Sequence, residues 1–167
     1  MGKQELASQL AINENSAEEF KNKFMKTFRN LDLFIHECQE DCVRNGMIYT
    51  FLKRRRIIGN KANEMSEAKT KGARIAVNSK IQGSAADILR LALLRIEETI
   101  LKDNLDAHLL LQLHDEVIYE VTSTEAPTVA KIIEYCMMNC TDLMVKLPVT
   151  IKIGKNWGQM ENFQALG

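Results

Sequence analysis

The sequence of 167 residues predicts an α+β fold: a small antiparallel sheet with a hairpin, packed on long helices and preceded by a helical segment. Three patterns support it. Hydrophobic side chains repeat at helical spacing near the start of the chain and again after Ser84. Two β-like runs, HLLLQL and VIYEV, flank His114, Asp115 and Glu116 and predict a hairpin. Residues 147–153 alternate between apolar and polar side chains, as a strand does.

Composition suits one or two small globular units, since 46% of the residues are hydrophobic and 26% are charged. No stretch approaches the roughly 20 uninterrupted apolar residues of a membrane span, and the start lacks a signal-peptide pattern. We therefore expect a reducing, intracellular compartment. The pairs Cys38/Cys42 and Cys136/Cys140 lie in predicted helices. Reduced helix cysteines are the favoured interpretation, and a four-cysteine zinc site is the alternative, because such sites usually have shorter spacings.

Charge is unevenly distributed although the formal net charge is zero. Residues 52–80 carry nine basic and two acidic side chains, including the run KRRR at 53–56, whereas both flanking parts are acidic. A basic block of this kind is typical of phosphate contact. A solvated, charged loop is the alternative, and charge alone favours the loop.

In the front part, a helix over residues 16–31 is predicted to begin with a capping box of Ser16 and Glu19. A second helix, over 33–45, ends at Gly46, and residues 47–52 form a short apolar segment that suits a strand. Residues 57–71 are predicted to be an exposed connection. The first helix carries an apolar stripe that we expect to face the core: Phe20, Phe24, Phe28 and Leu31.

In the second part, Ser84 and Asp87 form another predicted capping box after Gly83, at the start of a long helix buried on most sides. Thr124 is expected to cap a further helix, with Pro127 in its first turn. The last segment is predicted to be a turn anchored by Trp157. The inner face of the long helix is expected to carry Leu89, Leu93, Ile96 and Ile100.

The hairpin tip carries the candidate chemistry. Asp115 and Glu116 can both project from a tight reversal toward one point, while the apolar runs on each side suggest burial. Two carboxylates in such a place repel each other and need compensation, for which a divalent cation with oxygen ligands, Mg²⁺ or Mn²⁺, is suited. Paired ions would support phosphoryl transfer. A polar surface turn without any ligand is the alternative.

Three stretches in order, RIAVNSKIQGSAADILRLAL, LLLQLHDEVIYEV and IKIGKNWG, resemble the C-terminal half of a family A DNA polymerase, the group of bacterial DNA polymerase I. MGKQELASQLAI resembles the segment after the nucleotide-binding helix of the fingers, and NGMIYTFLKRRR resembles the family pattern G-x-x-x-T-x-x-G-R-R-R. The resemblance covers nearly the whole chain. QGSAADI, LQLHDE and YEV look most like the eukaryotic theta type.

This resemblance implies that residues 1–73 are part of the fingers and residues 74–167 the C-terminal part of the palm. The implied activity is template-directed nucleotidyl transfer to a primer 3′ end through two divalent metals, in DNA repair. Primer-template DNA, a deoxynucleoside triphosphate and the remainder of the polymerase are the implied partners. The nucleus is the implied location, with an organelle or the bacterial cytoplasm as alternatives.

Residue roles follow from the same resemblance. Asp115 matches the metal-binding aspartate, Glu116 its acidic neighbour at the metal site, and His114 the histidine that touches the primer terminus. Arginine and amide donors suit the minor groove, whose acceptors occur in either orientation of an A·T pair. The side chains implied to face that groove beside the new base pair are Arg74, Asn78 and Gln82.

The sequence also departs from the family pattern. Lys53 replaces the glycine before the three arginines, no proline follows them, and Gly72-Ala73 stands where Ala-Glu is frequent. A second metal-binding aspartate, in D-Y-S-x-I-E or similar, and the nucleotide-binding helix are not found, so we expect the isolated chain to be inactive. Two alternatives are a non-catalytic DNA-binding module, or an unrelated phosphohydrolase for which His36 and His108 give no supporting pattern.

Overall fold

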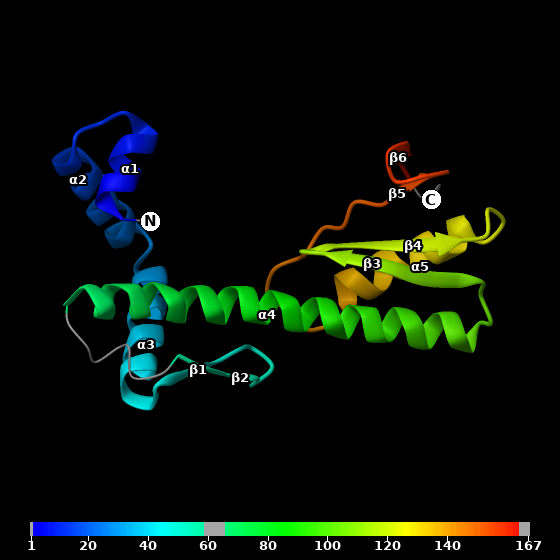
Figure 1. Cartoon of the computed structure of the whole chain (residues 1–167), viewed down its shortest axis with the longest axis horizontal. Helices are drawn as coiled ribbons and strands as arrows, with labels where there is room; N and C mark the ends of the chain where they lie inside the picture. The colour runs from blue at the N-terminus through cyan, green and yellow to red at the C-terminus, as the bar shows by residue number, and fades with distance from the viewer. Residues whose placement is uncertain (1, 59–65, 164–167) are drawn as a thin grey trace. The chain divides into compact units, whose positions relative to one another are not determined.

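A computed structural model describes the backbone of residues 2–58 and 66–163 and the side chains of residues 2–58 and 74–163. The chain divides into two compact units, Met1–Ile81 and Gln82–Gly167, which are considered separately (Figure 1). Helix α4, Ser66–Lys102, contributes to both units. Within the described residues, no helix is long and apolar enough to span a membrane.

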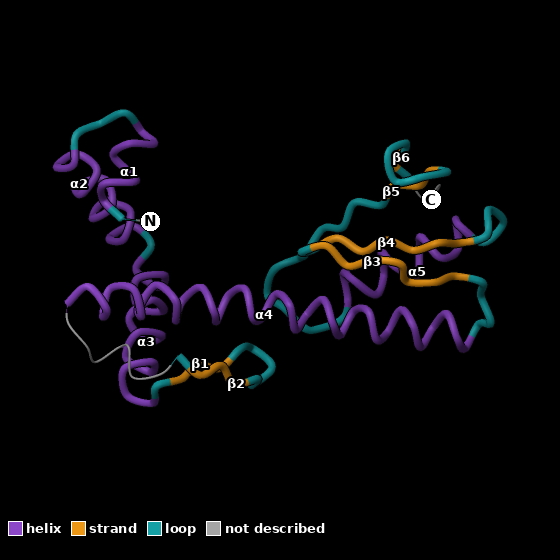
Figure 2. Tube along the Cα trace, in the orientation of Figure 1, coloured by secondary structure: helices purple, strands orange, loops and turns teal. Residues whose placement is uncertain are grey.

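The first unit contains the helices α1 (Lys3–Leu10), α2 (Glu14–Thr27) and α3 (Arg29–Asn45) (Figure 2). The predicted capping box of Ser16 and Glu19 is wrong, because α2 begins earlier. The side chain of Asn13 accepts a hydrogen bond of 2.8 Å from the backbone N–H of Ser16. Asparagine is among the best N-cap residues, and it takes the position that the sequence pattern gave to serine. Helix α3 ends, as predicted, at Gly46, whose φ of 63° is left-handed.

The aromatic stripe of α2 is not a core, contrary to prediction. Phe20, Phe24 and Phe28 are each about half exposed, although the rings of Phe24 and Phe28 lie 4.7 Å apart. Helix α1 contacts α2, but its eight residues are too few to cover the whole side of a 14-residue helix. The residue that each of these two helices buries is an alanine, Ala7 and Ala17.

The first unit also contains the hairpin of β1 (Met47–Tyr49) and β2 (Arg55–Ile57), and it ends within α4, at Ile81. Part of the predicted segment 47–52 is thus a strand, and the basic run continues into its partner. The turn is held by Thr50, whose N–H donates to the carbonyl of Arg54 and whose hydroxyl accepts from the N–H of Arg54, both at 3.0 Å. Lys53 lies in this turn with a left-handed φ of 63°.

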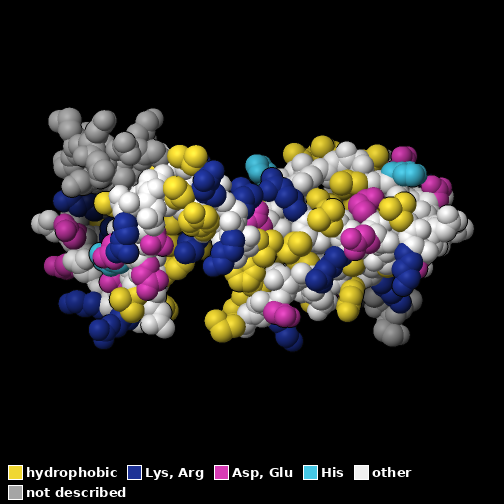
Figure 3. Space-filling model, turned by 90° about the horizontal axis from the view of Figure 1, so that it is seen from below, with side chains coloured by type: hydrophobic (Ala, Val, Ile, Leu, Met, Phe, Trp, Pro, Cys, Tyr) yellow, Lys and Arg dark blue, Asp and Glu magenta, His cyan; other side chains and the backbone are white. Residues whose placement is uncertain are grey.

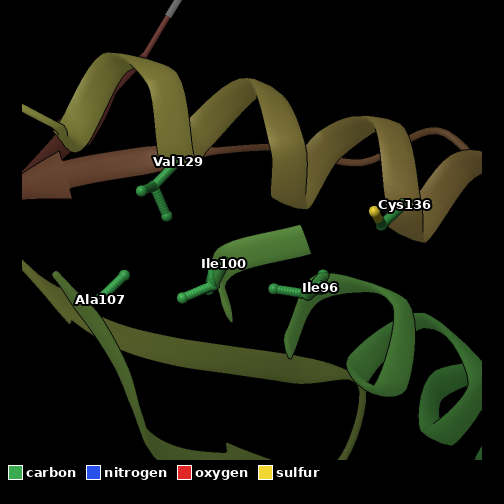
Figure 4. Packing of buried hydrophobic residues seen from close by; sticks show 5 residues of the cluster. All are labelled: Ile96, Ile100, Ala107, Val129 and Cys136. Carbon is green, nitrogen blue, oxygen red and sulfur yellow. The ribbon is translucent and has the colours of Figure 1, made fainter. Parts of the chain in front are cut away.

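The second unit packs the hairpin of β3 (Ala107–Leu113) and β4 (Glu116–Val121) against α4 and α5 (Ala126–Asn139). This arrangement confirms the α+β fold class. Figure 4 shows side chains from α4, α5 and β3 converging. The buried core consists of Ile96, Ile100, Ala107, Val129 and Cys136.

All four cysteines of the chain are buried and free. Burial raises the pKa of the Cys38, Cys42 and Cys136 thiols.

Helix α4 corrects the second predicted capping box. The helix is continuous through Gly83 and Ser84, so Ser84 is an interior residue and not a cap. Each interior glycine of a helix costs only about 1 kcal/mol, and no proline interrupts the segment. Asp87 is buried within the helix, 3.6 Å from the guanidinium of Arg90. Leu89, Ile96 and Ile100 are buried as predicted, but Leu94 is largely exposed, so α4 is not covered on most sides.

Three further predictions near the C-terminal end change. The residue that precedes α5 is Glu125 rather than Thr124, with proline in the first turn as expected. Of the strand predicted over 147–153, only β5 (Lys152–Gly154) forms, paired with β6 (Met160–Asn162). Trp157 lies in the turn between them with 58% of its surface exposed, so it does not anchor the segment. A strand needs a partner, and residues 147–150 have no strand partner within the described chain, whereas Ile151 accepts a 2.8 Å backbone hydrogen bond from Phe163.

The left-handed turn at Lys53 leads to a stability prediction. Replacing Lys53 by glycine should raise the free energy of unfolding by about 0.5–1 kcal/mol, because a Cβ is unfavourable at positive φ and glycine is not. Urea denaturation followed by circular dichroism measures the change. Lys53→Ala is the matched control, since it removes the charge but keeps the Cβ. A glycine variant no more stable than the alanine variant would contradict the left-handed assignment.

Candidate functional site at the β3–β4 hairpin

The tip of the β3–β4 hairpin is a two-residue turn. Leu113 pairs with Glu116, so His114 and Asp115 alone form the reversal and Glu116 begins β4. His114 has a φ of 54°, a left-handed conformation that costs a residue with a Cβ about 1–2 kcal/mol. Strained residues of this kind are concentrated at functional sites. The hairpin predicted at His-Asp-Glu is therefore confirmed, with the acids on consecutive positions of the turn and the strand.

The two carboxylates are open to solvent. His114, Asp115 and Glu116 are all exposed, and within the described chain neither carboxylate makes a hydrogen bond or an ion pair. Burial of these charges, which the flanking hydrophobic runs suggested, is thus not observed. The reason is that β3 itself is exposed over most of its length. An irregularity in the pairing lies there, between Leu109 and Leu111. The exposed leucines are Leu109, Leu110 and Leu111.

Strand β4 fixes the hairpin to the rest of the unit. Tyr119 packs against the buried core, and its hydroxyl donates a 3.0 Å hydrogen bond to the Glu97 carboxylate of α4. Burial, and secondarily the bond to Glu97, raises the pKa of Tyr119 well above its ordinary value, so the phenol stays protonated. At the far end of the hairpin, the N–H of Asp106 donates to the Glu125 carboxylate at 2.7 Å.

Sequence patterns gave no role to the pair of Tyr119 and Glu97. A signal was present: Glu97 is an acidic residue beside Ile96 on the apolar side of α4, and an ionisable group there needs a partner. The sequence alone does not identify this partner, because the two residues are 22 positions apart and are brought together by packing between elements. The pair is the polar contact that joins the acidic hairpin to its supporting helix.

The three predicted groove-facing residues lie on α4. Arg74, Asn78 and Gln82 are all exposed and are spaced four residues apart along the helix. Arg74 and Asn78 belong to the first unit, where Ala76 and Ser79 are buried, and Gln82 begins the second. The second unit thus brings together His114, Asp115 and Glu116, while Arg74 and Asn78 stand on the other unit.

The acids at the tip fit part of a metal site. Carboxylate oxygens that are exposed and without a hydrogen-bond partner can accept a hard divalent cation. Within the described residues, no group of three or more histidine, cysteine, aspartate or glutamate side chains is placed to hold a metal. His36 and His108 instead make exposed local pairs with Asp32, at 3.8 Å, and Asp106, at 3.1 Å. Asp115 and Glu116 therefore supply at most a partial ligand set.

Comparison with known proteins adds independent findings. Residues 1–159 match the model of the family described as DNA polymerase family A. The chain is 34% identical over 169 residues to DNA polymerase theta of Drosophila melanogaster, covering 96% of this chain and 8% of that protein. It is 33% identical over 152 residues to DNA polymerase I of Caldicellulosiruptor bescii, covering 91% of this chain and 18% of that protein. The chain thus spans less than a fifth of the length of these relatives.

A solved structure is similar to most of the chain. It is the POL domain of Pol1 from M. smegmatis in complex with DNA primer-template and dNTP, with a TM-score of 0.81 and 28% sequence identity. The similarity covers 88% of this chain and 26% of that chain.

The contact of Tyr119 with Glu97 can be tested by removing one oxygen. Tyr119→Phe should lower the free energy of unfolding by about 1–2 kcal/mol, because the half-buried Glu97 carboxylate loses its donor while the ring still packs. Chemical denaturation of the whole chain measures the loss. Tyr135→Phe is the matched control, since Tyr135 is largely exposed on α5. Equal effects of the two substitutions would show that the bond contributes nothing.

Proposed function

Because this chain belongs to DNA polymerase family A, we propose that it forms the C-terminal palm, residues 74–167, and part of the fingers, residues 1–73, of a DNA-directed DNA polymerase. The proposed reaction is template-directed transfer of a nucleotide to a primer 3′ end. The observation that carries the proposal is the exposed His-Asp-Glu turn inside a family match that spans residues 1–159. The M. smegmatis relative, in complex with primer-template and dNTP, supports these as the substrates.

Asp115 is proposed to bind a divalent metal, and Glu116 to add negative charge beside it. Mg²⁺ is the proposed ion and Mn²⁺ the alternative, since both prefer oxygen ligands. When bound, a pair of such ions stabilises the attacking and leaving oxygens of an in-line displacement. The chain's contribution is to hold the two acids on a short turn, which is fixed by the pairing of Leu113 with Glu116 and by the packing of β4.

The remaining site residues are proposed to contact DNA. His114, at the left-handed position of the turn, would touch the primer terminus. Arg74, Asn78 and Gln82 would face the minor groove, where arginine and amide donors meet acceptors common to both orientations of an A·T pair. Such contacts depend on the geometry of the base pair and do not distinguish its sequence. A role in DNA repair in the nucleus is proposed, with an organelle or the bacterial cytoplasm as alternative locations.

The isolated chain is proposed to be inactive, because the described residues hold no more than two acids at the turn and nucleotidyl transfer by two ions requires further ligands. In a polymerase these would come from the remainder of the catalytic unit. The same observation favours the second candidate function, a non-catalytic DNA-binding module that retains the fold. The two candidates differ in whether the chain supports primer extension when the remainder is supplied.

A chimeric enzyme separates the candidates. The matching segment of the Caldicellulosiruptor bescii polymerase is replaced by this chain, and primer extension is measured with Mg²⁺. We expect extension by the chimera and none by the isolated chain. Asp115→Asn in the chimera should lower the rate by about 100-fold or more, since a metal ligand contributes several kcal/mol to the transition state. Asp103→Asn, an exposed acid in the same unit, is the control and should leave the rate unchanged.

Two results would contradict the proposal. A folded chimera that binds primer-template but does not extend it would favour the non-catalytic module. Extension by the isolated chain, abolished by Asp115→Asn, would show that a complete ligand set lies within these residues.

A further inference from the structure

The β1–β2 hairpin presents an outer face of mixed aromatic, apolar and basic character. Residues opposite each other in an antiparallel pair lie on the same face, as do alternate residues of one strand. Tyr49 pairs with Arg55 and Met47 with Ile57, so these four side chains define the outer face. Tyr49 is 45% exposed and Ile57 is 68% exposed.

The opposite face is buried only on β1, since every residue of β2 is exposed. It carries Ile48, which is only 1% exposed, paired with Arg56. The pairing thus separates two neighbouring arginines that the sequence alone leaves equivalent: Arg55 stands beside the exposed tyrosine, and Arg56 stands beside a buried isoleucine. The left-handed turn at Lys53 and the two hydrogen bonds between Thr50 and Arg54 fix this register.

The guanidinium of Arg55 is available to a ligand, since it makes no hydrogen bond or ion pair within the described chain. The Tyr49 hydroxyl lies 3.4 Å from the sulfur of Met47, so the tyrosine and the methionine lie together on the outer face. Figure 3 shows basic and hydrophobic side chains exposed side by side on one surface of the molecule. Strand β2 of the hairpin lies within the basic block, since residues 52–80 carry nine basic and two acidic side chains.

We propose that this outer face binds single-stranded DNA, with a base stacked on the Tyr49 ring and an adjacent phosphate paired with Arg55. Grooves that bind single strands combine positive charge along the backbone with aromatic rings on which bases stack. In a duplex the faces of the bases are covered by their neighbours, so a lone exposed tyrosine favours an unpaired strand. The choice of DNA as the nucleic acid rests on the proposed polymerase function, whereas stacking and charge pairing do not.

Binding of a labelled oligothymidine to the whole chain, followed by fluorescence anisotropy at low salt, tests the tyrosine. Tyr49→Ala should weaken binding by about 5- to 100-fold, the range found when one stacked base loses its aromatic platform. Tyr49→Phe retains the ring and should bind like the unchanged chain. Tyr135→Ala, another exposed tyrosine, is the control and should have no effect.

The salt dependence tests the arginine. Arg55→Ala should reduce the slope of log K against log salt concentration by about 0.7, the value for one phosphate contact to a single strand. Tyr49→Ala should leave that slope unchanged, because stacking involves no counterion. Arg29→Ala, an exposed arginine of α3, should alter neither slope nor affinity appreciably.

The proposal is overturned if the chain does not bind the oligonucleotide at low salt, or if Tyr49→Ala binds as tightly as the unchanged chain. Tighter binding of duplex DNA, unaffected by Tyr49→Ala, would also overturn it, and a clear preference for oligouridine would overturn the choice of DNA. None of these measurements requires catalysis. Their failure is therefore distinguishable from failure of the polymerase proposal, which primer extension tests.

Discussion

The packing of β4 against α4 and α5 determines where the acidic turn of this protein lies. A two-stranded hairpin is marginally stable in water without a surface to pack on. Here Ile96 and Ile100 of α4 and Val129 of α5 provide that surface, and the hydroxyl of Tyr119 adds a directed bond to Glu97. The turn is thereby held on a rigid support while its carboxylates remain in solvent.

Exposure of β3 follows from the same packing. The core receives Ala107 from this strand, while Leu109, Leu110 and Leu111 keep 39%, 58% and 40% of their surfaces in contact with water. Apolar area on a strand that has only one partner within the described chain is unfavourable. The hydrophobic runs beside the acids therefore do not describe a buried charge. They describe a strand whose burial is incomplete in these 167 residues, so no buried ion pair or cation is needed to explain why the acids are tolerated.

Local patterns predicted the type of most elements, whereas contacts between elements determined what they buried. The hairpin at His114 and Asp115, the helix end at Gly46 and the buried Ile96 and Ile100 depend on turn chemistry and periodicity, and all were predictable. Helix starts were not, because Asn13 lies close enough to Ser16 to compete for the cap. The exposed Phe20 stripe and Trp157, and the short strand β5, depend on partners that no local pattern specifies. The contact of Tyr119 with Glu97 could not be predicted for the same reason, because it joins two separate elements.

The turn at Lys53 connects a departure from the family pattern with the presentation of the basic block. The resemblance places glycine at this position, and in this chain lysine adopts the left-handed conformation at a cost of about 1 kcal/mol. The conformation is maintained because the bonds between Thr50 and Arg54 close the turn on both sides of it. If the turn adopted another length, the pairing would shift by one residue, and Arg56 instead of Arg55 would stand beside Tyr49. The hydrogen bonds between Thr50 and Arg54, more than the identity of residue 53, therefore decide which arginine stands beside Tyr49.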